Sequence, residues 1–309
     1  MAKPQAVILP TPGPSALFLV LRVPELARDG AEVVRIAART PALAQAVARL
    51  DPKAKLASGI AFGSALWDVA SPVARPRGLH PFRLVAAEDR RAPATPGDLL
   101  LHVTSKRPDL NFELALRVRA ALGARVEVVE EVHGFQYLDI RDLTGFIDGT
   151  QNPKGVRGRS EAALIGREDP AFAGGSYVFT QRYVHDLARW NALPLAEQES
   201  AVGRRKRDSK EMSDKAKPPS AHISRVVIVE SGAELEIVRH SLPYGTTSEA
   251  GLFFLAYTRD LVIPERMLER MLGASGDGIH DRLMEFTHAV SGAAFFAPSE
   301  TALRRLAAG

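Results

Sequence analysis

Two charged side chains in the second half of the chain have the types and settings that acid–base chemistry needs. The first is Asp148 in GFIDGTQNP (residues 145–153), where Asp-Gly and Asn-Pro are both turn dipeptides. A turn alone would explain the Asp-Gly pair, but the apolar neighbours Phe146 and Ile147 predict that the loop is partly buried. A buried carboxylate needs a partner or a chemical task, so Asp148 is a candidate site residue.

The second is Arg239, in the alternating segment ELEIVRHSLPYG. In a strand, a period of two puts Leu235, Ile237 and Arg239 on one face, with Ser241 next along it. Leucine and isoleucine assign that face to the interior, so the guanidinium points toward a buried place and needs an anion there. A structural ion pair would meet that need, and so would a ligand. Asp148 is a candidate counter-charge, and both residues could face one cavity.

The histidines give a weaker signal, because no two of the eight have the H-x-x-x-H spacing of a zinc helix. His222 follows KAKPPSA, whose two prolines hold the chain extended, and it begins HISRVVIVE, which predicts a strand over residues 222–230. A lone histidine at the start of a strand is more often a hydrogen-bonded structural residue than a ligand. On the residues alone, both roles stay open for His222.

Composition excludes several classes of protein. The net charge of +4 is too small to indicate a nucleic-acid binder. The absence of cysteine excludes a disulfide framework, a thiolate nucleophile and cysteine-bound metal. Prolines at positions 4, 10, 12 and 14 would interrupt the apolar core of a signal peptide, and the longest apolar run is too short to span a bilayer. We therefore expect a cytoplasmic protein with no nucleic-acid or membrane partner.

One segment is much more basic than the chain as a whole. GRRKRDSKEMSDKAK (residues 203–217) carries seven basic residues in fifteen, with three acidic residues among them. A solvated loop or helix end explains such a mixture, and a docking surface for carboxylates or phosphates is the alternative.

The elements that must position these residues predict an α+β fold. In the first half, strands and helices follow the split β-α-β order of a ferredoxin-like module, with strands at 15–23, 55–63, 98–105 and 124–132 and helices at 25–50 and 109–122. The second half repeats the pattern more loosely, with strands at 176–184, 222–230, 234–240, 251–258 and 293–299 and helices at 186–203, 264–273 and 281–290. We place the two modules at residues 1–134 and 135–309, each with an antiparallel sheet.

Taken together, the second-half motifs resemble the dye-decolorising peroxidase superfamily in its bacterial B-type branch. The matching pieces are GFIDGTQNP, the GRRKRDS block, AHISRVV, IVRHSLPYG with GLFFLAYTR, and the tail MLERMLGASGDGIHDRLMEFTHAVSGAAFFAPS. They run in the right order over residues 145–299, and their combination is far more specific than any one of them. The first half matches only in its pattern of strands and helices.

The resemblance implies two ferredoxin-like modules and a haem b (iron protoporphyrin IX) held mainly by the second. His222 matches the axial ligand of the iron, and Asp281 is the candidate carboxylate that accepts its imidazole N–H. Asp148 and Arg239 match the catalytic pair on the other side of the haem, and Ser241 matches a catalytic-side position where the family carries Asn or Ser. The remaining cofactor-binding assignments are Arg204, as a propionate contact, Gly149, Thr150, Gln151 and Phe254.

The implied activity is reduction of hydrogen peroxide through a ferryl intermediate, with oxidation of dyes, phenolic compounds or other bulky one-electron donors. We assign O–O cleavage to Arg239 and proton handling to Asp148. Bulky donors would react at the haem edge or through a surface residue, Trp67, Trp190 or a tyrosine. We also expect a homo-oligomer. Packaging in an encapsulin shell is not favoured, because the chain stops at ETALRRLAAG without a long targeting tail.

Two other functions fit the same residues. A protein that carries or processes haem, with incidental peroxidase activity, would have the same pocket. An anion-binding module could use Arg239 and the 203–217 segment without any haem. A Soret band in haem-reconstituted protein, and steady-state turnover of a dye with peroxide, discriminate among these functions.

Overall fold

Strands of the first half pair into one antiparallel sheet. A computed structural model describes residues 2–71 and 74–308. The first-half elements are β1 (Ser15–Arg22), α1 (Leu26–Ala37), α2 (Thr40–Ala48), β2 (Ala57–Phe62), α3 (Ser64–Ala70), β3 (Val85–Ala87), β4 (Arg90–Ala92), β5 (Leu99–Ser105), α4 (Pro108–Leu122) and β6 (Glu127–Phe135). The sheet order is β2-β5-β1-β6, while β3 and β4 form a separate hairpin that the sequence analysis did not predict.

The second half repeats this strand order. Its elements are α5 (Gly155–Ala163), β7 (Ser176–His185), α6 (Leu187–Ala192), α7 (Leu195–Val202), α8 (His222–Val226), β8 (Val229–Glu230), β9 (Ala233–Glu234), β10 (Val238–Arg239), β11 (Leu242–Gly245), β12 (Ala250–Thr258), α9 (Val262–Leu272), the 3-10 helix η4 (Arg282–Glu285), β13 (Thr287–Ala289), β14 (Ala293–Ala297) and α10 (Glu300–Ala308). The order β10-β12-β7-β14 corresponds to second, third, first and fourth strand, as in the first half. The predicted fold class, α+β with two ferredoxin-like antiparallel sheets, is confirmed.

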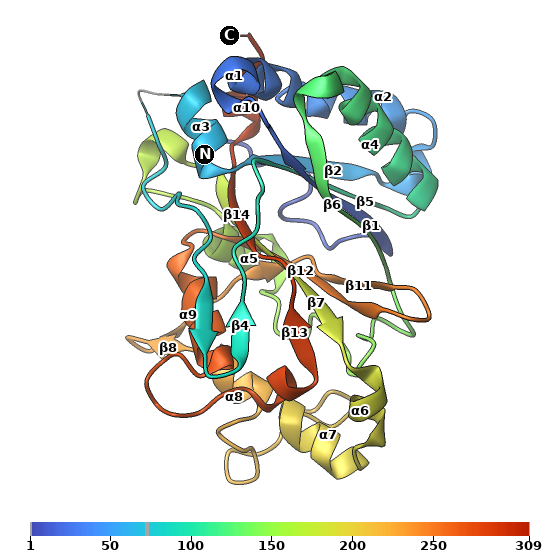
Figure 1. Cartoon of the computed structure of the whole chain (residues 1–309), viewed down its shortest axis with the longest axis vertical. Helices are drawn as coiled ribbons and strands as arrows, with labels where there is room; N and C mark the ends of the chain where they lie inside the picture. The colour runs from blue at the N-terminus through green and yellow to red at the C-terminus, as the bar shows by residue number, and fades with distance from the viewer. Residues whose placement is uncertain (1, 72–73, 309) are drawn as a thin grey trace.

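The two halves share a layer of packed side chains. β14 pairs with β2 at Phe296 and Phe62, so both sheets belong to one ten-stranded assembly. Their inner faces meet where Phe18 of β1 stacks on Phe253 of β12, with ring centroids 4.3 Å apart. In Figure 1 the helices α1, α2 and α4 cover the first sheet at the top, and α6, α7 and α8 lie at the opposite end. The sheets therefore lie between two sets of helices.

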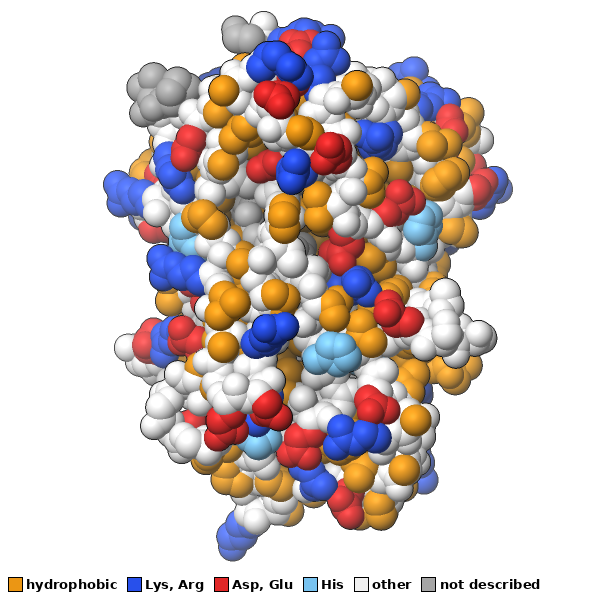
Figure 2. Space-filling model, viewed as in Figure 1, with side chains coloured by type: hydrophobic (Ala, Val, Ile, Leu, Met, Phe, Trp, Pro, Cys, Tyr) orange, Lys and Arg blue, Asp and Glu red, His pale blue; other side chains and the backbone are white. Residues whose placement is uncertain are grey.

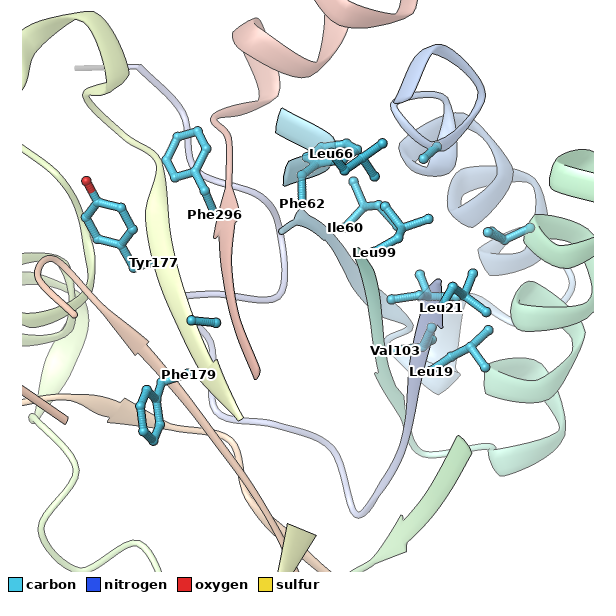
Figure 3. Close-up of a cluster of buried hydrophobic side chains, with 14 of the residues drawn as sticks. Leu19, Leu21, Ile60, Phe62, Leu66, Leu99, Val103, Tyr177, Phe179 and Phe296 are labelled. Atoms are coloured by element: carbon cyan, nitrogen blue, oxygen red, sulfur yellow. The ribbon is translucent and has the colours of Figure 1, made fainter. Parts of the chain in front are cut away.

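Apolar residues pack densely between the first sheet and its helices. Leu19 and Leu21 of β1, Val103 of β5 and Ile60 of β2 belong to one buried cluster, and Figure 3 shows them close together beneath the helices. The same cluster reaches Phe179 of β7. The cluster therefore joins the core of the first half to the second half.

The predicted strand at residues 222–230 is wrong. His222–Val226 form the short helix α8, and only Val229–Glu230 are a strand. The β-branched run ISRVVIV favours a strand, but Ile223 and Arg225 are buried where α8 packs against α9. Tertiary packing has overridden the local preference.

The predicted helix at residues 281–290 is also wrong. Asp281 caps the 3-10 helix η4 by accepting a hydrogen bond from the backbone N–H of Leu283 at 2.8 Å. Thr287–Ala289 then form β13, which pairs with Tyr183–His185 at the end of β7. An exposed edge of β7 was available for pairing, and the sequence alone does not reveal it.

The surface mixes charges and apolar groups. Figure 2 shows them interspersed on the face turned to the viewer. Much of the basic segment 203–217 is paired internally: Glu211 contacts Arg204 at 3.2 Å and Lys217 at 2.5 Å, and Arg205 pairs with Asp208. This pairing favours the solvated-loop interpretation. In the residues that the structure describes, no helix has both the length and the apolar character needed to cross a membrane.

Candidate active site

A large cavity opens on the outer face of the second sheet. Its walls come from the loop after Phe146, strands β7, β10 and β12, and helices α8 and α9. Most of the residues assigned to the site from the sequence line it, namely Asp148, Gly149, Thr150, Gln151, Arg204, His222, Arg239 and Phe254. Segments more than a hundred residues apart in the sequence, such as those of Asp148 and Phe254, thus contribute to one cavity.

Asp148 and Arg239 lie together in this cavity. Their Oδ1 and Nη1 atoms are 3.7 Å apart, and both side chains are about a quarter exposed, 28% and 22%. This is an ion pair, but the separation exceeds a direct hydrogen bond. A small oxygen-containing molecule can therefore contact both groups.

Asn152, which the sequence analysis did not single out, fastens the Asp148 loop to β10. Its amide donates to the carbonyl of Arg239 at 2.9 Å and accepts from the N–H of Arg239 at 2.8 Å. The loop that carries the carboxylate and the strand that carries the guanidinium are thus fixed to each other. The Asn-Pro dipeptide indicated a turn, but not this pairing across 87 residues.

Two glycines shape the same loop. Gly145 and Gly149 have φ of +86° and +74°, a region that other residues adopt only with strain. A Cβ at Gly145 would also collide with the side chain of Lys206. Both glycines are therefore required by the backbone conformation that presents Asp148.

His222 and Asp281 form a second polar pair. His222 lies at the start of α8, and its Nδ1 is 2.5 Å from Oδ2 of Asp281. Asp281 is completely buried and lies behind the histidine, whereas His222 lines the cavity. The carboxylate fixes the Nδ1–H tautomer, so the lone pair of Nε2 is available to an acceptor in the cavity.

Arg204 adds a second positive charge to the cavity wall. It donates to the carbonyl of Ser209 at 2.6 Å and contacts Glu211 at 3.2 Å. Burial lowers the pKa of Arg204; Glu211 opposes this, and the positive charge of Arg239 adds to it. Two guanidinium groups that influence each other across one cavity favour a ligand with negative charge.

Further polar residues of the cavity were missed by the sequence analysis. Two of them, Gln181 and His185, lie on β7. The amide nitrogen Nε2 of Gln181 and the ring nitrogen Nε2 of His185 are buried, and neither has a hydrogen-bond partner in the described part of the chain. Asp142 also has an unpartnered oxygen and lies 3.5 Å from His185. Burial raises the pKa of Asp142, but the nearby His185 and the hydrogen bonds from Thr144 bring it below its usual range. Only the alternation of β7 could have indicated that these residues share a face.

The structure places Ser241 and the two tryptophans differently from what the sequence predicted. Ser241 does not line this cavity; it lines a neighbouring one, and its hydroxyl accepts from the N–H of Leu255 at 3.2 Å. Trp67 and Trp190 are not surface residues, since they are 3% and 0% exposed. Trp190 is buried by Phe146 and Phe286, so the expectation of a surface tryptophan is wrong.

Comparison with known families decides the identity of the fold. The model of the Dyp-type peroxidase N-terminal domain matches residues 5–136, and that of the C-terminal domain matches residues 139–302. The chain belongs to the Dyp-type peroxidase family. A dye-decolorizing peroxidase of Mycolicibacterium paratuberculosis is 42% identical over 302 residues, which cover 96% of this chain and 84% of that protein.

Solved structures agree with this family. DyPB of Rhodococcus jostii has a TM-score of 0.93 at 40% identity, and 98% of each chain is covered. A DypB variant in complex with heme has the same TM-score at 39% identity, again with 98% of each chain covered. The encapsulated DyP-type peroxidase of Mycobacterium smegmatis has a TM-score of 0.93 at 40% identity and 98% coverage of each chain. The predicted family, its B-type branch and the peroxidase class of enzyme are confirmed.

Proposed function

We propose that this family member is a haem b peroxidase that reduces hydrogen peroxide and oxidises dyes, phenolic compounds or other bulky one-electron donors. One observation carries the proposal: the same cavity is lined by His222, backed by Asp281, and by the ion pair of Asp148 and Arg239. The first pair suits an axial ligand, and the second suits acid–base work on a peroxide.

The residues present fit a haem. A neutral imidazole whose Nδ1 donates to a buried carboxylate is a strong iron ligand through Nε2. Phe254, Ile223, Leu268 and Met271 supply apolar walls for a macrocycle, and Arg204 supplies a cation for a propionate. When bound, haem would supply the redox chemistry, since it can give two electrons to peroxide and regain them one at a time from donors.

Asp148 and Arg239 would divide the work on peroxide. The carboxylate of Asp148 takes a proton from one peroxide oxygen and returns it to the other, directly or through a water molecule. The guanidinium of Arg239 stabilises the negative charge that develops on the departing oxygen. The space between Oδ1 and Nη1 allows both contacts at once.

Donors too bulky for the cavity would transfer electrons at the protein surface. Of the five tyrosines and two tryptophans, only Tyr137 is not buried. We therefore propose Tyr137 in place of the two tryptophans as the entry point. A Tyr137→Phe variant should turn over a bulky dye more slowly and react with peroxide at the normal rate; equal dye turnover would exclude Tyr137.

The main experiment is reconstitution with haem. The wild-type protein should show a Soret band and oxidise a phenolic dye with peroxide, and His222→Ala should lose both. Haem binding without dye turnover would favour a haem carrier. If no Soret band appears in the wild type, the haem assignment fails.

The separate roles of Arg239 and Asp148 are tested by rapid mixing of the haem-loaded variants with peroxide. Arg239→Ala should slow the spectral change by about 100- to 1000-fold if its charge stabilises the departing oxygen. Asp148→Ala should slow the spectral change less in alkaline buffer than in neutral buffer, because solvent base can then remove the proton from peroxide. A wild-type rate in Arg239→Ala would reverse the assignment.

Assembly is a separate part of the proposal. We propose a homo-oligomer and do not favour packaging in a protein shell, although an encapsulated DyP-type peroxidase is among the similar structures. Sedimentation of the purified protein tests the first point. Co-purification with a co-expressed shell protein would contradict the second.

A further inference from the structure

A second cavity adjoins the one described above and has an excess of positive charge. It is lined by the basic residues Arg141, Lys154, Arg159 and Arg239 and by a single acidic residue, Asp148. Asp148 and Arg239 line both cavities, so this ion pair stands between them. The charges of the second cavity therefore act directly on the proposed peroxide site.

Arg159 is a buried cation of this cavity that the fold leaves without a counter-ion in the described residues. It is only 7% exposed, and its contacts are the carbonyl of Leu9 at 2.9 Å and the hydroxyl of Thr11 at 3.3 Å. No carboxylate lies within ion-pair distance of it in residues 2–71 and 74–308, and its Nε is buried without a partner. A buried guanidinium without a counter-ion is costly unless an anion joins it.

The start of α5 points to the same place. Gly155 and Val156, the first residues of this nine-residue helix, line the cavity, and Lys154 at the N-cap provides no side-chain cap. Free N–H groups and the helix dipole favour an anion at such an end. Arg159 lies one turn into the helix, and side chains on a helix lean toward its N-terminus. Two independent features thus favour negative charge at one position.

Apolar groups make up much of the remaining lining, and Thr11, Gln136, Asn152 and Ser241 add polar groups to it. Tyr137, Pro10, Pro12, Ile140 and Leu242 form the walls beside these cations. An inorganic anion would leave this surface unused, whereas a carboxylate on a compact apolar body would contact both parts.

We propose that the second cavity binds a small organic carboxylate, with Arg159 and the N-terminus of α5 holding the carboxylate and the apolar wall holding its body. Because the bound ligand lies against Asp148 and Arg239, it controls access of peroxide to that pair. The binding step does not depend on the proposed peroxidase chemistry, so the two can fail separately.

The test is calorimetric titration of the haem-loaded protein with benzoate. Benzoate should bind saturably, and benzyl alcohol, which has the same ring without the charge, should not. Arg159→Gln should weaken benzoate binding by about tenfold or more. Arg157→Gln is the matched control, since Arg157 lies on the same helix, is 92% exposed and pairs with Glu161; it should leave binding unchanged.

Three results would overturn the proposal. Inorganic phosphate that binds as tightly as benzoate would show an oxyanion site without a place for an apolar body. A benzoate-induced shift of the Soret band that survives in Arg159→Gln would place the ligand on the cofactor instead. If Arg159→Gln does not fold, Lys154→Gln at the exposed N-cap replaces it, and unchanged benzoate binding in that variant counts against the site.

Discussion

The two halves of the molecule have the same strand order, yet the outer faces of their sheets are used differently. In the first half, Leu17, Leu19 and Leu21 of β1 pack under the helices of 12 and 15 residues, α1 and α4. In the second half, the equivalent first strand, β7, turns Gln181 and His185 toward a cavity.

The difference arises from the connections. After β7 the chain makes the short helices α6, α7 and α8, of 6, 8 and 5 residues. After β1 it makes the longer helices α1 and α2, of 12 and 9 residues. Strand order alone therefore does not decide whether a sheet face becomes core or binding site. The length and placement of the covering helices decide it, and each prediction below tests one consequence of this contrast.

The largest effect should come from matched leucine truncations in the two halves. Leu19→Ala should lower the free energy of unfolding by about 3 kcal/mol or more, because it leaves a hole in a filled core. Leu252→Ala, at a partly buried residue of β12 that lines the cavity, should cost less, about 1 kcal/mol, since that side chain already lacks packing partners on its cavity side. Urea unfolding of the haem-free protein measures both values. Equal costs would contradict the contrast between the halves.

Loss of the carboxylate behind His222 should have the next largest effect. Asp281→Asn should weaken haem binding by about 10- to 100-fold, because the imidazole loses the acceptor that orients it. Haem transfer to an apo-acceptor protein gives the rate of loss. Asp214→Asn, at a side chain that is 99% exposed, is the control and should behave as wild type.

The layer shared by the halves should make stability depend on pH. Burial lowers the pKa of His102 to about 3, and burial together with the neighbouring His102 and Arg159 lowers the pKa of His240 well below its usual value. The folded protein keeps both rings neutral, whereas the unfolded chain takes up protons as the pH falls below about 6.5. Unfolding free energy should thus fall on acidification, on the order of 2 kcal/mol for His102 between pH 7 and pH 5.

Urea unfolding of His102→Phe at several pH values tests whether His102 causes the pH dependence of stability. The variant loses the bond to Tyr257 at 3.0 Å, so it should be less stable at pH 7, but its stability should change less between pH 7 and pH 5. His133→Asn, at a side chain that is 54% exposed, serves as the control. An unchanged slope in His102→Phe would assign the acid sensitivity to other groups.

The smallest effect should come from loss of the Asn152 hydrogen bonds that join the Asp148 loop to β10. Asn152→Ala removes two hydrogen bonds to the backbone of Arg239 and should slow peroxide-dependent turnover by about tenfold or less. Haem affinity should stay the same, since Asn152 does not line the haem cavity. Wild-type turnover in Asn152→Ala would show that the loop holds Asp148 in place without these hydrogen bonds.

Much of the fold followed from local signals. Helices form within the predicted ranges 25–50 and 186–203, each divided into two near a proline, Pro41 or Pro194, and Gly123 follows the last residue of α4. The errors lie at the site itself, where α8 replaces a strand and β13 replaces part of a helix. These segments depend on contacts with α9 and β7 that are distant in sequence, so local preference could not decide them. The division at residue 134 stays a prediction.

By itself, the sequence determined the strand order, the inward alternation that aims Arg239 and the motifs that indicate the family. These depend on periodicities and turn residues that act over a few positions. Only the tertiary structure decided which polar groups meet: Asp281 behind His222, Asn152 against Arg239, and Ser241 in the neighbouring cavity. The reason is physical, because a contact between distant residues depends on how layers pack and not on the residues beside each partner.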